Sequence, residues 1–143
     1  MPIAEVADKL IDPASQSLTL ADCGRPDLPL IYVNRGYEKM TGYTREEVIG
    51  QNCRFLQGAG TDKTTIEKIK LAIGASEPTI VDLLNYRKDG STFWNRLSII
   101  PVKNGAGATT HFIGIQTDIS RMRQLQDRLY KLALELQNLV QTV

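Results

Sequence analysis

The sequence predicts a single α+β domain in which an antiparallel sheet carries helices on one of its faces. Two observations support this fold class. The chain has 143 residues, enough for one domain with a core but too few for two domains of ordinary size. Apolar and polar residues alternate along several short segments, and a stretch with helical spacing separates the first two of these segments from the last three.

The chain begins with a predicted helix and a predicted hairpin. Apolar residues share one side of a helix over residues 3–11, and Pro13 ends that helix. Residues 17–22 (SLTLAD) and 30–34 (LIYVN) are predicted strands, separated by the turn-rich segment CGRPDLP. A turn of this composition between two strands predicts a hairpin.

The middle of the chain, roughly residues 35–76, is predicted to be helical and interrupted by glycines. Thr44 and Glu47 form a capping box, which opens a short helix that Gly50 closes. A longer helix is predicted over about residues 61–73, with a glycine directly after it.

The pattern then changes to a period of two. Residues 79–88 and 91–103 flank the dipeptide Asp89-Gly90, which is a strong hairpin signal. Residues 110–119 form the last predicted strand. The order of two strands, a helical middle and three strands suits one sheet with helices packed on one face.

One face of these last three strands is apolar beyond what a core needs. An exposed patch of this size is unusual on a monomer, so terminal helices, a second subunit or both are expected to cover it. Its members are Leu84, Tyr86, Trp94, Ile100, His111, Ile113 and Ile115.

The tail of the chain has a heptad pattern. A helix that packs on its own domain usually shows a wider apolar stripe, so we favour pairing with a second copy over packing in cis. The predicted organisation is an N-terminal helical cap (1–16), a core (17–118) and an amphipathic, coiled-coil-like helix (119–143). The seam residues alternate at spacings of three and four: Met122, Leu125, Leu129, Leu132, Leu136, Leu139 and Val143.

Composition argues against several classes of function. Seventeen basic and sixteen acidic side chains leave a net charge of +1, so neither nucleic acid nor an acidic tail is indicated. No apolar run could span a bilayer, and the N-terminus lacks the features of a secretory signal, so a cytoplasmic protein without membrane contact is expected. Two cysteines and one histidine do not supply the clustered ligands of a zinc site.

Cys53 lies within the segment GQNCRFLQG, residues 50–58. This segment resembles the GxNCRFLQ signature of LOV domains, the light-sensing branch of the PAS family. Residues 28–50, 84–95 and 112–120 resemble the family's neighbouring segments, so the resemblance covers about residues 17–120 in the right order. The chain is similar to short bacterial LOV photoreceptors, and the resemblance implies a PAS-like five-stranded sheet and a receptor rather than an enzyme.

The resemblance also implies a flavin cofactor, with FMN favoured over FAD or riboflavin. In this family, blue light leads the cysteine thiol to add to flavin carbon C4a while N5 gains a proton, and the adduct reverts in darkness. Signalling would pass through the terminal helices of a homodimer, without a fused effector domain, to an unidentified downstream protein. The implied photoactive residue is Cys53, and the implied cofactor-binding residues are Asn52, Arg54, Leu56, Gln57, Ile66, Lys70, Asn85, Asn95, Leu97, Gly114 and Gln116.

Side-chain amides suit a flavin because its pyrimidine edge alternates carbonyl acceptors with an N–H donor, and an amide carries both kinds of group. If the hairpin loop is Asp89-Gly90-Ser91, Asn85 stands opposite Asn95 on one face. A two-residue loop would put these amides on opposite faces, so the flavin interpretation requires the longer loop. Gly114 and Gln116 share a face of the last strand, where the missing side chain lets a flat ring approach.

The phosphate end of the site is predicted to be weak. The guanidinium of Arg54 suits a flavin phosphate, and Lys70 is a second cation at a position that matches the family. Some short bacterial relatives carry additional arginines where this chain has Thr61 and Ile66.

Two alternatives remain open. The chain could be a PAS-type ligand or redox module in which Cys53 is incidental, since a lone cysteine is commonly a small buried apolar residue. It could instead be a thiol enzyme that pairs Cys53 with His111. Cys23 lies in a predicted turn and is assigned no role, and Trp94 is interpreted as a packing residue.

Overall fold

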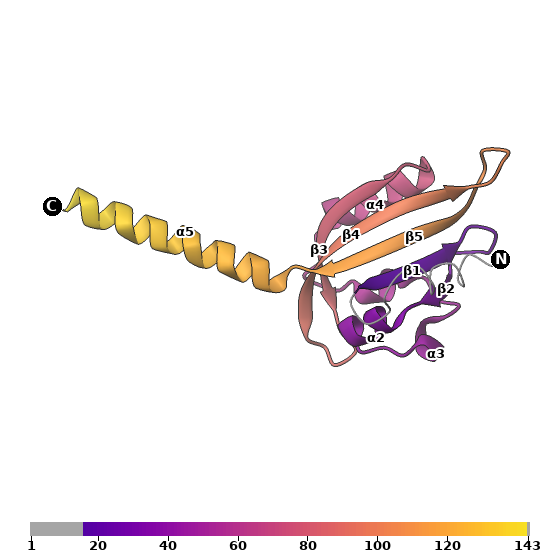
Figure 1. Cartoon of the computed structure of the whole chain (residues 1–143), viewed down its shortest axis with the longest axis horizontal. Helices are drawn as coiled ribbons and strands as arrows, with labels where there is room; N and C mark the ends of the chain where they lie inside the picture. The colour runs from indigo at the N-terminus through magenta and orange to yellow at the C-terminus, as the bar shows by residue number, and fades with distance from the viewer. Residues whose placement is uncertain (1–15, 143) are drawn as a thin grey trace.

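The computed structural model describes residues 16–142, and its core is a five-stranded antiparallel sheet, as the sequence predicts. The helix predicted over residues 3–11 lies outside the described residues. The strands are β1 (Ser17–Asp22), β2 (Leu30–Val33), β3 (Thr79–Tyr86), β4 (Thr92–Lys103) and β5 (Thr109–Asp118). They lie in the order β2-β1-β5-β4-β3, so the first and last strands of the chain are neighbours (Figure 1).

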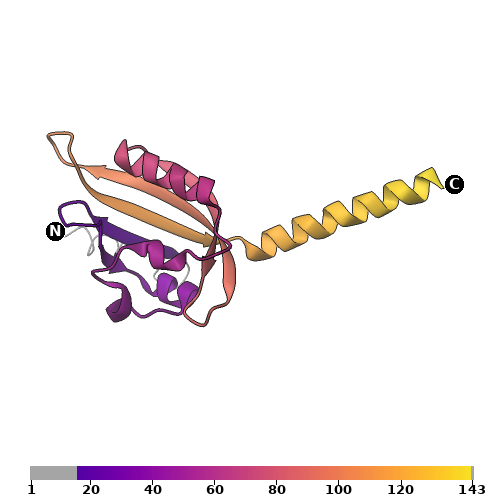
Figure 2. The same cartoon turned by 180° about the vertical axis from the view of Figure 1, so that it is seen from behind.

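The helices between β2 and β3 cover one face of this sheet, as Figure 2 shows. We call this covered face the inner face. Because the N–H groups that open a helix lack intrahelical partners, a polar side chain precedes each of these helices and accepts a hydrogen bond from its first turn. The elements are α2 (Arg35–Thr41), α3 (Arg45–Val48), the 3₁₀ turn η1 (Cys53–Leu56) and α4 (Lys63–Gly74).

The observed starts of α3 and α4 can be compared with the starts predicted from the sequence. The capping box of Thr44 and Glu47 is present in full at the start of α3. The helix α4 begins two residues later than predicted, because the side chain of Asp62 accepts a hydrogen bond from the backbone of Thr64 and so acts as its cap. Gly74 belongs to the last turn of α4 and does not follow the helix.

The hairpin of β3 and β4 puts its two asparagines on the inner face, as predicted, but their predicted pairing is wrong. Asn85 stands opposite Phe93, and Asn95 stands opposite Leu83. Arg87 N donates to Ser91 O over 2.8 Å, so residues 88–90 form the loop. This loop has the same length as the predicted one but starts one residue earlier, which shifts the pairing by two positions. Because strand side chains alternate with a period of two, both amides keep their face.

Buried polar side chains separate two apolar clusters beneath the inner face. One cluster contains Leu30, Val33, Tyr37, Val48 and Leu56. The other contains Ile69, Val81, Leu83, Ile99 and Phe112. The polar groups include Ser17, Thr19, Asn85, Asn95 and Gln116. Polar side chains at such depth need partners, so this region of the inner face is suited to a polar ligand.

The outer face is partly buried. Ile113 and Ile115 of β5 pack against a cluster formed by Leu18, Leu20 and Tyr32. Ile100 of β4 stays 40% exposed. Some of the apolar surface predicted there is therefore covered within the described residues, and some is still open.

The helix α5 (Ser120–Gln141) extends away from the domain (Figures 1 and 2). None of its residues is buried, and the predicted seam is open, with Leu125 exposed by 50% and Leu129 by 67%. The alternative in which this helix packs against its own domain is therefore not adopted, whereas its pairing with a second copy stays a prediction. Within residues 16–142, none of the helices is long and apolar enough to cross a membrane.

Candidate functional site

Cys53 is the first residue of η1, and its position is fixed through the segment before it. Gly50 N donates to Leu30 O, and Leu30 N donates to Gln51 O, each over 2.8 Å, so this segment is attached to β2. Gly50 has a φ of +89°, a conformation that glycine adopts without steric penalty. Asn52 then caps the turn by accepting a hydrogen bond from Arg54 N at 2.9 Å. The predicted signature thus builds a turn that presents the thiol.

A cavity of about 420 Å³ opens beside this turn. Its walls come from η1, α4 and the β1–β2 loop, and it includes six of the residues predicted from the sequence. This volume lies within the range of small-molecule sites. The lining residues are Asp27, Leu28, Asn52, Cys53, Arg54, Gln57, Ile66, Ile69, Lys70, Ile73 and Gly74.

The thiol of Cys53 is held in its protonated form. Cys53 is an exposed residue at the border of the cavity. The surrounding protein nevertheless removes water from its thiol, and this desolvation raises the pKa of the Cys53 thiol. The turn's backbone hydrogen bond and the charge of Arg54 act in the opposite direction but are smaller effects. Enzymes that use a cysteine nucleophile usually lower this pKa, so the shift at Cys53 has the opposite direction.

His111 is placed away from this cavity. It is half-buried on the face of β5 opposite Gln116, and its Nδ1 lies 2.9 Å from Thr110 Oγ1. It is not among the residues that line the Cys53 cavity. The structure therefore does not bring together the Cys53–His111 pair that the enzyme alternative requires.

The two asparagines of the hairpin form a buried amide pair. Asn95 Nδ2 donates to Asn85 Oδ1 over 2.9 Å, and Asn85 Nδ2 donates to Leu56 O over 3.2 Å. Asn95 Oδ1 is buried and has no hydrogen-bond partner among the described residues. A buried acceptor left unpaired costs about 1–3 kcal/mol. This oxygen is therefore suited to accept a hydrogen bond from a ligand that enters along the sheet.

Gln116 lies buried on the neighbouring strand β5, where β1 supplies its partners. Ser17 Oγ donates to Gln116 Oε1 over 2.6 Å, and Gln116 Nε2 donates to Thr19 Oγ1 over 3.0 Å. A Cβ atom on Gly114 would lie 2.3 Å from Thr19 Oγ1, so only glycine fits there. Ser17 and Thr19 were missed in the sequence analysis, although their alternation along β1 was a usable signal.

Asp27 is a second group that the sequence analysis missed. Its carboxylate accepts hydrogen bonds from both Nη1 and Nη2 of Arg54, at 2.7 and 2.5 Å. This contact lowers the pKa of Asp27 and raises the pKa of Arg54. The guanidinium predicted to bind a phosphate therefore already holds a carboxylate at the mouth of the cavity.

Several predicted residues take other positions. Leu56 is buried in the cluster with Tyr37, and Leu97 packs against the cluster of Ile69. Thr61 is not at the phosphate end of the cavity, which corrects its expected place. It is buried, and its Oγ1 donates to Leu84 O over 2.6 Å and accepts from Gly58 N. Cys23 packs against the Ile69 cluster.

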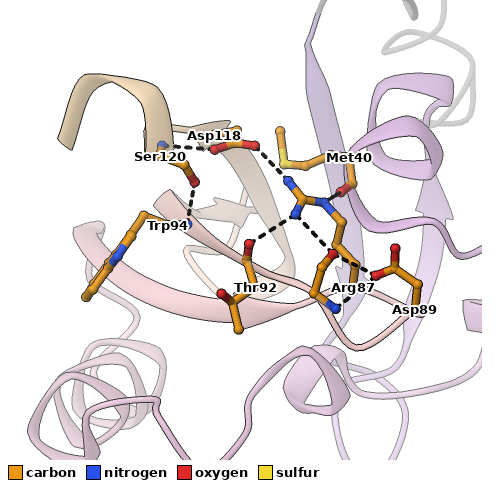
Figure 3. A network of polar contacts seen from close by, with 8 residues as sticks. Met40, Arg87, Asp89, Thr92, Trp94, Asp118 and Ser120 are labelled. Carbon is orange, nitrogen blue, oxygen red and sulfur yellow. Dashed lines mark hydrogen bonds and ion pairs between the residues drawn. The ribbon is translucent and has the colours of Figure 1, made fainter. Parts of the chain in front are cut away.

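Arg87, directly before the hairpin loop, connects the end of β3 to the end of β5, as Figure 3 shows. Its Nε donates to Met40 O over 3.0 Å, and its Nη1 donates to Thr92 O over 3.1 Å. Its Nη2 forms an ion pair with Asp118 at 3.0 Å. One side chain thus joins α2, β4 and the residue that precedes the start of α5 by two positions.

The first turn of α5 is also attached to β4. Asp118 Oδ1 accepts from Ser120 N over 3.0 Å, and Ser120 Oγ accepts from Trp94 N over 2.9 Å (Figure 3). The guanidinium carbon of Arg123 lies 3.7 Å from the centroid of the Trp94 ring, a favourable cation–π distance. Trp94, interpreted from the sequence as a packing residue, therefore also anchors the helix.

The chain is similar to known proteins in both sequence and structure. The family model described as "PAS domain" matches residues 21–121. The blue-light-activated histidine kinase 1 of Erythrobacter litoralis is 42% identical over 125 residues, covering 85% of this chain and 35% of the relative. The blue-light-activated histidine kinase of Brucella abortus is 45% identical over 114 residues, covering 77% of this chain and 23% of the relative. The chain thus spans about a third or less of these relatives.

Solved structures agree with this similarity. The LOV domain of the Erythrobacter litoralis EL346 blue-light activated histidine kinase has a TM-score of 0.72 and 46% identity, covering 74% of this chain and 97% of that one. An RNA-binding light-oxygen-voltage receptor has a TM-score of 0.82 and 38% identity, covering 93% of this chain and 38% of that one.

Proposed function

Because the chain belongs to the PAS family and to its light-oxygen-voltage (LOV) branch, we propose that it is a blue-light receptor in which Cys53 bonds reversibly to a bound flavin. The blue-light-activated relatives support the sensory role. The kinase activity in their names is not part of the proposal, because this chain matches only 35% and 23% of these relatives' length.

The observation that carries the proposal is the arrangement of one protonated thiol with several neutral amides. Cys53 and Gln57 border the cavity, while Asn85, Asn95 and Gln116 lie on the inner face. The unpaired Oδ1 of Asn95 suits a hydrogen-bonding ring, whereas the space left by the missing side chain at Gly114 is taken up by the contact of Thr19 with Gln116. Neutral amides can satisfy such a ring without burying a charge.

When bound, the flavin supplies light absorption and a ring carbon, C4a, that accepts a thiol after excitation. Cys53 would supply the sulfur for that bond, and its S–H hydrogen would pass to flavin N5. In darkness Cys53 would recover the same hydrogen as the bond is released. The raised pKa of Cys53 keeps this hydrogen on the sulfur before illumination.

The other residues bind and orient the cofactor in this proposal. Asn85 and Asn95 would contact the pyrimidine edge, and Gln116 would face N5. Arg54 and Lys70 border the cavity and serve the cofactor tail. A tail that ends in one phosphate matches this pair of cations, so we favour FMN over FAD or riboflavin.

Output is proposed to pass through α5. Gln116 lies in β5, the strand that leads into this helix, and the open leucine seam of α5 suits a pair of helices from two copies. A change in hydrogen bonding at Gln116 would then alter the packing of that pair and its contact with a downstream protein.

The decisive experiment is absorption spectroscopy on the purified chain. A flavin spectrum that bleaches under blue light and recovers in darkness supports the proposal. A colourless protein, or a flavin with no thiol-linked photocycle, would instead support the PAS ligand or redox module in which Cys53 is incidental.

A further inference from the structure

The charged side chains that line the Cys53 cavity are Asp27, Arg54 and Lys70. Asp27 and Arg54 meet in a fork-to-fork arrangement, with donor–acceptor distances of 2.7 and 2.5 Å. A phosphate would use the same fork of the guanidinium. The carboxylate of Asp27 therefore occupies the contact that Arg54 would offer to an anionic ligand.

The loop backbone fixes the place of Asp27. Asp27 and Leu28 have φ angles of +67° and +50°, in the left-handed region that residues other than glycine adopt infrequently. Asn52 Nδ2 donates to Asp27 O over 2.8 Å, and Leu28 packs against the cluster of Ile69. These contacts hold the loop in the position from which the carboxylate of Asp27 contacts Arg54 at the mouth of the cavity.

Resting on the flavin site proposed above, we infer that Asp27 sets cofactor specificity by competing with the flavin phosphate for Arg54. A phosphate monoester carries nearly two negative charges at neutral pH. FMN must therefore displace Asp27 from Arg54 or bind beside a like charge. Riboflavin ends in a neutral hydroxyl and meets neither cost. The chain therefore prefers FMN over riboflavin less strongly than Arg54 and Lys70 alone would dictate.

The size of this effect is bounded by exposure. The side chains of Arg54 and Asp27 are 59% and 62% exposed, and exposed ion pairs are worth up to about 1 kcal/mol. The expected change in selectivity is therefore about fivefold.

The test is a titration of the flavin-free full chain with FMN and with riboflavin, followed by flavin fluorescence. The quantity of interest is the Kd for riboflavin divided by the Kd for FMN. Asp27→Asn keeps the shape of the side chain but removes its charge, and it should raise this ratio about fivefold. Asp22→Asn is the matched control and should not change the ratio, because Asp22 pairs with Arg25 and does not line the cavity.

The substitution Arg54→Gln separates competition from a general charge effect. In that background Asp27→Asn should change the ratio little, because no guanidinium is left to release. An unchanged ratio in Asp27→Asn, an equal loss of both flavins, or an undiminished effect without Arg54 would overturn the inference. A wild-type chain that binds neither flavin would instead refute the proposed function itself, and the inference with it.

Discussion

Ser17 and Gln116 are 99 residues apart in the sequence, yet Ser17 Oγ donates a 2.6 Å hydrogen bond to Gln116 Oε1. The contact exists because β1 pairs with β5 in register, with Ser17 directly opposite Gln116. It fixes the amide so that its oxygen accepts from β1 and its nitrogen donates to Thr19. Any event that turns this amide must break both bonds at the strand that leads into α5.

Gln116→Leu should keep reversible bleaching but remove most of the light-dependent change in α5. When flavin N5 gains a hydrogen it changes from acceptor to donor, and only an amide can respond by presenting its oxygen. Hydrogen exchange of residues 119–125 in darkness and in light measures this relay. Gln51→Leu, at an exposed glutamine outside the sheet, is the control. A full light response in Gln116→Leu would refute the relay.

Cys53→Ala should bind flavin, fluoresce more persistently and lose reversible bleaching, because no other residue is proposed to supply the sulfur. Absorption after a blue pulse measures the loss. Cys23→Ala is the matched control, since Cys23 lies outside the lining of the cavity. If Cys53→Ala still formed a long-lived photoproduct with the same spectrum as the wild-type photoproduct, the proposed bond would be excluded.

Leu129→Glu combined with Leu136→Glu should raise the dimer Kd by at least about a hundredfold, because charges buried in an apolar seam cost several kcal/mol. Sedimentation or light scattering provides the measurement. Lys131→Glu with Asn138→Glu has the same seven-residue spacing on the same helix but lies outside the seam, so it should have little effect. A monomeric intact chain would show that the seam does not form a dimer. A dimer that survives the two leucine substitutions would instead place the interface on the outer face of the sheet.

Arg87→Gln should destabilise the fold by about 1 kcal/mol, because it removes an ion pair and the charge assistance of several hydrogen bonds that are partly screened by solvent. The greater effect should be local, as faster hydrogen exchange at residues 119–123. Arg25→Gln removes the ion pair with Asp22 at the β1–β2 turn, away from α5, and serves as the control. Equal exchange at residues 119–123 in both variants would show that Arg87 does not anchor the helix.

Ile66→Arg should slow dark recovery. The slowing reaches about tenfold if the new contact raises the barrier to reversion of the adduct by about 1.4 kcal/mol. The new cation lines the cavity and would restrain the phosphate end of the cofactor. Thr61 is unsuited to the same change, because it is buried against β3. Leu71→Arg, at a residue of α4 that is 67% exposed, is the matched control. Equal recovery in wild type and Ile66→Arg would mean that the phosphate end does not set the lifetime.

The sequence by itself determined the strands, the capping box at Thr44 and the turn that carries Cys53, because these features depend on neighbouring residues. It also determined that Asn85 and Asn95 share a face. A shift of two positions changes the partner of a strand residue but not its face, so this prediction was correct although the exact pairing was not.

Only the tertiary structure decided which distant residues meet. The strand order brings Ser17 to Gln116, the β1–β2 loop brings Asp27 to Arg54, and the hairpin loop brings Arg87 to Asp118. None of these pairs has a local spacing that would reveal it, because each depends on how separate elements pack. The same holds for Thr61, whose hydroxyl donates a hydrogen bond to Leu84 O of β3. The residue type alone does not indicate this contact, because it depends on how the segment before α4 packs against β3.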